Sequence, residues 1–176
     1  MKNIILTAIF ATAALLFAGC SDENPYSGYH ASFKFNSTFH PYNQVRTPGQ
    51  YICVRRGRNH GEYKLTDALG KTTTVQVPEI DLQQGKFHYG LGGLIIGTPS
   101  AYGEGALIVY DWACPSCDLE KYRLNIDRDG GTGKATCPEC GTEFDLNSGG
   151  VAVKKKSKPL RRYRVIDDGT TVIVQN

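Results

Sequence analysis

Hydrophobic and polar residues alternate in short segments along most of the chain. Tyr29, Ala31, Phe33 and Phe35 are separated by single residues that are mostly polar, and residues 122–126 repeat the alternation. A period of two is typical of a strand with one buried face, whereas the continuous apolar run at residues 51–54 predicts a strand buried on both faces.

Further segments of the same kind follow, separated by turn-forming residues. Residues 72–77 are rich in β-branched side chains, and residues 92–96 and 106–112 read as a pair of strands. Residues 163–166 and 171–174 read as a final hairpin around an Asp-Asp-Gly turn. Apart from the N-terminal segment, no stretch keeps a helical period. We therefore expect an all-β antiparallel sandwich or barrel.

The N-terminal segment has the pattern of a secretory signal. Lys2 precedes an almost purely apolar run at residues 4–17, which is too short and wrongly flanked for a spanning helix. The letters LFAGC at positions 16–20 resemble the lipobox of bacterial lipoproteins, and that resemblance implies that Cys20 is lipidated and becomes the first residue. Ordinary secretion with an unmodified Cys20 is the alternative.

This interpretation divides the chain into a signal peptide at residues 1–19, a lipidated tether at 20–28 and a β domain at 29–176. It implies a location in the cell envelope as an outer-membrane lipoprotein, with the membrane as a partner through the N-terminal lipid. Removing Lys2 lowers the formal charge of +3 by one, so the mature chain carries no charge signature of nucleic-acid binding.

Four cysteines in two short motifs carry the strongest chemical signal. Cys114 and Cys117 form one Cys-Pro-x-Cys turn, Cys137 and Cys140 form another, and nineteen residues separate them. Such turns direct two thiolates at one ion, so this spacing predicts a metal centre with four sulfur ligands, in a subdomain that we place at residues 112–150. Disulfides are the alternative in an oxidising compartment. A thioredoxin-type dithiol would need a βαβ context, which this pattern lacks.

The remaining candidate ligands have simpler interpretations. Cys53 lies inside an apolar strand and is expected to be a small buried hydrophobic residue. The four histidines all precede the cysteine motifs, and no spacing recruits any of them to the site: His30, His40, His60 and His88.

The sequence around the second motif resembles a known family. CPECGTEFDLNSG, residues 137–149, resembles the second cluster-binding loop of Rieske proteins, in which Cys-Pro-x-His-Gly precedes Phe-Asp and a later Gly. Residues 106–115 resemble the strand that enters the first loop of that fold, and residues 159–176 resemble its closing hairpin. The resemblance covers residues 105–176. Residues 20–104 resemble lipid-anchored Rieske-like proteins of Gram-negative bacteria more loosely. It implies a Rieske-like β fold and a [2Fe–2S] cluster that transfers single electrons.

Both histidine positions of the Rieske pattern differ here, because Ser116 and Cys140 stand in their places. Four thiolates would lower the cluster potential from the Rieske range toward the roughly −400 mV of plant-type ferredoxins. They equally suit one Zn²⁺ or iron ion held as in rubredoxin or zinc-ribbon knuckles. The sequence thus leaves two functions open. One is an electron carrier with an all-cysteine cluster, and the other is a non-redox binding or scaffold lipoprotein with a structural ion. We expect no enzyme activity, because no spacing suggests a catalytic iron site.

A basic segment follows the cysteine motifs. Seven lysines and arginines lie within eleven residues, from Lys154 to Arg164. A solvated edge strand is the simpler explanation, because lysines on an edge discourage strand pairing between molecules. The alternatives are a docking patch for an acidic redox partner or anionic lipid, and neutralisation of the four thiolates.

Overall fold

The structure is a computed structural model that describes residues 26–100 and 105–176. A nine-stranded antiparallel sheet forms most of it, in the order β4-β3-β2-β6-β7-β12-β13-β1-β5. Its strands are β1 (Ala31–Asn36), β2 (Tyr51–Arg56), β3 (Glu62–Thr66), β4 (Thr72–Gln76), β5 (His88–Tyr89), β6 (Leu94–Gly97), β7 (Ile108–Asp111), β12 (Arg162–Asp167) and β13 (Thr171–Gln175).

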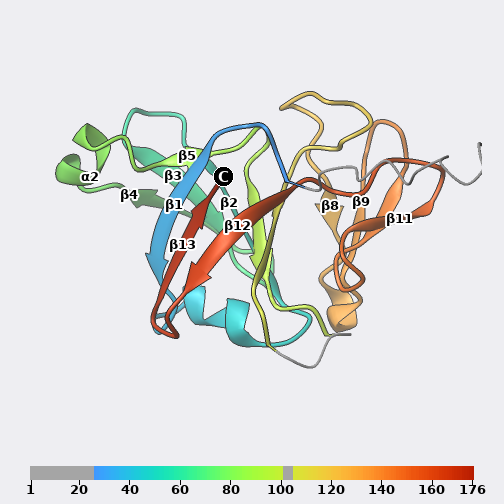
Figure 1. The fold of residues 1–176 in the computed structure, drawn as a ribbon, viewed down its shortest axis with the longest axis horizontal. Helices are drawn as coiled ribbons and strands as arrows, with labels where there is room; N and C mark the ends of the chain where they lie inside the picture. The colour runs from blue at the N-terminus through green and yellow to red at the C-terminus, as the bar shows by residue number, and fades with distance from the viewer. Residues whose placement is uncertain (1–25, 101–104) are drawn as a thin grey trace, which may run out of the picture.

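A smaller antiparallel sheet of four strands lies beside the large one (Figure 1). Its order is β11-β10-β9-β8, with β8 (Asn125–Ile126), β9 (Lys134–Thr136), β10 (Glu143–Asp145) and β11 (Val151–Lys154). All four strands come from the part of the chain between β7 and β12, so this sheet is one continuous insertion into the large sheet.

The large sheet is rolled, because its last strand, β5, comes back into contact with β2. The roll encloses a core of aromatic and aliphatic side chains. Its largest fully buried members include Phe33, Ile52, Leu65, Leu94 and Ile96.

A second core lies between the rolled sheet and the small sheet. Tyr51, Cys53, Ile95 and Tyr110 contribute to it from the rolled sheet. Because neighbouring side chains on a strand point to opposite faces, Ile52 and Ile96 enter one core while Tyr51 and Ile95 enter the other. The prediction that residues 51–54 form a strand buried on both faces is confirmed.

The all-β antiparallel architecture is confirmed, with differences in detail. The strands β3, β5, β9, β10 and β11 were not singled out from the sequence. Residues 122–126 contribute only the two-residue strand β8. Arg123, which precedes it, forms an isolated bridge to Ala113. One α-helical turn, α2 (Glu79–Gln83), follows Pro78 where no helix was expected.

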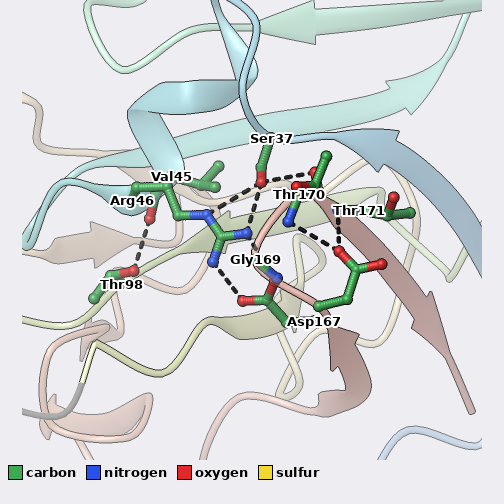
Figure 2. A network of polar contacts seen from close by, with 9 residues as sticks. Ser37, Val45, Arg46, Thr98, Asp167, Gly169, Thr170 and Thr171 are labelled. Carbon is green, nitrogen blue, oxygen red and sulfur yellow. Dashed lines mark hydrogen bonds and ion pairs between the residues drawn. The ribbon is translucent and has the colours of Figure 1, made fainter.

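Two short 3₁₀ turns complete the described elements, η1 (Tyr42–Arg46) and η2 (Asp129–Gly131). Figure 2 shows how η1 is fixed to the final hairpin. The Arg46 guanidinium donates to both carboxylate oxygens of Asp167, at 2.5 and 2.7 Å, and also to the Ser37 hydroxyl. The Thr98 hydroxyl donates to the Val45 carbonyl at 2.7 Å. These bonds join β1, β6, β12 and η1 at one end of the roll.

The predicted signal peptide, and Cys20 with most of the tether, lie outside the described residues. In the ranges that the structure describes, no helix has both the length and the apolar character needed to cross a membrane.

Candidate metal centre

The structure brings the four predicted thiols together. The Sγ atoms of Cys114, Cys117, Cys137 and Cys140 all lie within 4.8 Å of one another. The Cys114–Cys140 separation is 3.7 Å, and the Cys117–Cys137 separation is 3.8 Å. Each of these close pairs contains one cysteine from each turn, so the two turns face each other across a single point. This group could hold a metal ion.

The two turns have the same backbone construction, which explains why their thiols converge. In each turn the residue after the second cysteine donates its N–H to the carbonyl of the first, from Asp118 to Cys114 and from Gly141 to Cys137, both at 2.9 Å. Both of these residues have a left-handed backbone, with φ of 50° at Asp118 and 67° at Gly141. Glycine adopts this conformation without strain, and aspartate is among the few other residues that tolerate it.

Asp118 has contacts that explain why an aspartate occupies this position. Its Oδ1 accepts hydrogen bonds from Tyr29 Oη at 2.9 Å and from the Arg161 guanidinium at 2.8 Å. The same guanidinium lies 5.1 Å from the centre of the Tyr29 ring. The first cysteine turn is therefore fixed to the N-terminal segment and to the chain that leads into β12.

Asp111 fixes the segment that leads from β7 into the first cysteine turn. Its side chain is fully buried and accepts four hydrogen bonds. Oδ1 accepts from the backbone N–H groups of Gly92 and Ala113 at 3.0 and 2.8 Å. Oδ2 accepts from the Leu91 N–H at 2.8 Å and the Tyr163 hydroxyl at 2.6 Å. One carboxylate thus joins the end of β7, the loop before β6 and strand β12, immediately ahead of Cys114.

Gly90 is required where it lies in this arrangement. Its φ is +68°, and a Cβ atom there would lie 2.0 Å from the Tyr163 hydroxyl oxygen and 2.6 Å from Asp111 Oδ2. A side chain at this position would therefore displace the hydrogen bond between Tyr163 and Asp111.

The thiols differ in burial and in proton affinity. Cys114 and Cys137 are buried in the second core, whereas Cys117 and Cys140 are half-buried. Burial raises the pKa of the Cys114 thiol to about 11. Burial also acts to raise the pKa of the Cys140 thiol, but hydrogen bonds from Thr142, Cys137 and Cys114 outweigh it and lower that pKa to about 6.

The Thr142 hydroxyl lies 3.2 Å from Cys140 Sγ. The Lys155 ammonium donates to the Cys140 carbonyl. Hydrogen bonds from Thr142 stabilise the thiolate of Cys140, so Cys140 is the candidate ligand best prepared to bind a cation at neutral pH.

The other residues considered from the sequence lie away from this group. Cys53 is fully buried and free, and its sulfur lies 3.4 Å from the Arg128 guanidinium. No histidine belongs to the thiol group within the described ranges. His30 and His88 instead form a ring pair with centroids 4.3 Å apart.

The basic segment divides into two parts. Its lysines are exposed on and after β11, which is an edge strand of the small sheet. Its arginines have structural partners: Arg161 pairs with Asp118, Arg162 donates to the Gly149 carbonyl, and Arg164 lies 5.4 Å from the Tyr26 ring.

Asp111 is the residue of the site that sequence reasoning missed. It lies in the apolar segment 106–112, where a lone acidic residue on a strand predicted to be buried was an available signal. Buried carboxylates need several donors, but which donors surround this one depends on contacts between segments far apart in sequence.

Comparisons with known proteins give little further information. No family model and no curated protein matches the chain. A solved structure, the ferredoxin of carbazole 1,9a-dioxygenase from Nocardioides aromaticivorans IC177, matches with 18% identity over 47% of this chain and 73% of that one, at a TM-score of 0.31. A likeness of this strength does not assign the chain to a family, and the functional argument therefore rests on the site itself.

Proposed function

We propose that this chain is a lipid-anchored protein of the cell envelope and that its four thiolates bind one metal ion in tetrahedral geometry. The ion that we propose is Zn²⁺, and its role is to hold the small sheet against the rolled sheet. The convergence of the four sulfur atoms is the observation that carries this proposal. The lipid anchor rests on the lipobox-like residues 16–20.

The sulfur separations match those around one ion. A tetrahedral centre with metal–sulfur bonds of about 2.3 Å has sulfur atoms about 3.8 Å apart. The separations of 3.7 and 3.8 Å across the two turns agree with that edge length. These two separations support the proposal that the four thiols bind one cation.

A binuclear cluster needs a wider ligand set. Two tetrahedra of this size that share an edge place their outer edges roughly 5 Å apart, so thiols on different irons lie at least that far from each other. All four sulfur atoms here lie within 4.8 Å of one another. This difference favours one ion over the [2Fe–2S] cluster that the Rieske resemblance implies.

The position of the site suits a structural ion. Cys114 and Cys117 follow β7 of the rolled sheet, while Cys137 and Cys140 lie between β9 and β10 of the small sheet. The strands of the small sheet are short, and Leu124, Ala135 and Phe144 are among the buried residues of the core beneath it. Ligand binding adds folding free energy where such a core is limited.

The test is metal analysis of the full chain purified without oxygen and without added zinc. We expect one zinc per chain and no visible colour, and we expect Co²⁺ substitution to give the absorption bands of tetrahedral sulfur coordination. Cys137→Ser should lose the metal, while Cys53→Ala, a cysteine change outside the group, should retain it. Metal bound equally by both variants would refute the assignment.

One-electron transfer is the second candidate function. Cys117 and Cys140 are half-buried, and exposed lysines of residues 154–158 lie next to the second turn, where Lys155 contacts Cys140. A ligand edge near the surface and a basic patch suit exchange with an acidic redox partner. One iron with reversible bleaching on reduction would support a mononuclear carrier. Two irons with acid-labile sulfide would instead support the [2Fe–2S] cluster that the Rieske resemblance implies.

The anchor has its own test. Mass spectrometry of the chain from its native membrane should find residues 1–19 removed and acyl chains on Cys20. An unmodified Cys20 would leave ordinary secretion as the explanation of the apolar segment.

A further inference from the structure

A cavity of about 380 Å³ lies apart from the four thiols, none of which lines it. It is formed where the ends of β2 and β5 meet the glycine-rich residues 90–93 and the segment after the first cysteine turn. We call it the arginine–histidine cavity after the side chains that line it: His30, Arg56, His88 and Arg123, with Glu120 as the acidic member.

The charges on its walls do not balance. Arg123 is paired with Glu120, at 2.8 Å, and also donates to the Gly92 carbonyl. Among the described residues that line the cavity, Glu120 is the one carboxylate, and this pairing uses it. Arg56 is exposed, lines the cavity and takes part in no ion pair within residues 26–100 and 105–176.

The two histidines add donors next to this charge. Their rings come from neighbouring strands, since β1 pairs with β5, and the centroids are 4.3 Å apart. Burial, His30 and Arg56 together lower the pKa of His88. A bound anion would have the opposite effect on His88, because it favours the protonated form of that ring.

The remaining wall leaves space for a ligand. Gly90, Gly92 and Gly93 form part of the wall with their backbone, and a Cβ atom on any of them would contact neighbouring protein atoms. Its volume lies within the range of small-molecule sites. The cavity therefore combines room for several ligand atoms with excess positive charge and planar donor groups.

We propose that the arginine–histidine cavity binds a phosphoryl group, either as free phosphate or as a small phosphomonoester. Guanidinium groups donate in a fork that matches phosphate oxygens, and protonated imidazoles add further charged donors. His30 Nδ1 already lies 3.3 Å from Asn176 Oδ1, and a phosphoryl dianion would supply a counter-charge for Arg56 and further acceptors beside the two rings. This site is independent of the metal and of its identity.

The test is isothermal titration calorimetry of the metal-loaded full chain with inorganic phosphate, and separately with glycerol phosphate as a soluble phosphomonoester. We expect binding at one site. Arg56→Gln should weaken it at least tenfold, and His88→Gln should weaken it severalfold. Lys71→Gln removes the same unit of charge from an exposed hairpin and should change the affinity less than twofold.

Two comparisons decide the outcome. Tighter binding of glycerol phosphate identifies a phosphomonoester as the ligand, and equal or tighter binding of phosphate identifies the free ion. Ring signals of His30 and His88 should shift on titration in NMR spectra of the wild-type chain. Absence of binding by both probes in the millimolar range would overturn the proposal. Equal affinities of the wild-type and Arg56→Gln chains would also overturn it.

Discussion

The buried carboxylate of Asp111 allows a sharp test of how the site is held. Asp111→Asn preserves the shape of the side chain but replaces one acceptor oxygen with an NH₂ group. If the remaining oxygen keeps the bonds from Gly92 and Ala113, the new NH₂ faces the Leu91 N–H, and two donors then oppose each other.

The hydrogen bonds that Asp111 accepts set the expected loss of stability. A hydrogen bond to a charged group contributes about 1.5–3 kcal/mol, and an unpaired buried donor costs about 1–3 kcal/mol. The Tyr163 hydroxyl can rotate to accept a hydrogen bond from the new NH₂ group, so only part of the stabilisation from this contact is lost. We expect Asp111→Asn to lower the free energy of unfolding by about 3 kcal/mol. Tyr163→Phe removes one donor only and should cost about 1.5 kcal/mol.

Trp112 provides the assay, because it is the single tryptophan of the chain and lies next to the site, where its indole donates to the Leu124 carbonyl at 2.7 Å. Urea unfolding followed by its fluorescence, with the metal content held constant, gives the free energies. Asp129→Asn, on an exposed aspartate, is the control and should change stability by less than about 0.5 kcal/mol. A cost for Asp111→Asn no greater than that for Tyr163→Phe would refute the role assigned to the carboxylate.

Three further predictions concern other parts of the chain. Cys53 should resist iodoacetamide at neutral pH until the protein unfolds, because burial raises its pKa to about 11; mass mapping of alkylated peptides would show rapid labelling if the thiol were accessible. Asp118→Gly should relax the left-handed backbone but remove the partner of Arg161, giving a net loss of about 1 kcal/mol in thermal unfolding, and a gain in stability would mean that backbone strain outweighs the ion pair. Asp167→Asn should cost about 1 kcal/mol at neutral pH. The Arg46 guanidinium lowers the pKa of Asp167, so this difference should persist above the ordinary aspartate pKa of about 3.9 and disappear as the pH falls through the lower folded value; unfolding curves from pH 7 to pH 2 would contradict it if the difference grew in acid.

The sequence by itself determined the fold class and the four candidate metal ligands. Alternation of apolar residues is a local property of a strand, so the β character of segments such as residues 29–35 and 51–54 was readable without contacts. The two Cys-Pro-x-Cys turns were equally local, because in each the residue after the second cysteine donates its backbone N–H to the carbonyl of the first cysteine.

Only the tertiary structure decided how these parts meet. Spacing cannot tell how closely two separate turns approach each other, and here the four sulfur atoms lie within 4.8 Å of one another. Asp111 gained its role in the same way, since its four donors come from residues 91, 92, 113 and 163. The arginine–histidine cavity likewise joins β2, β5 and the segment after the first turn. These features depend on packing between distant segments, which the pattern of a single segment does not encode.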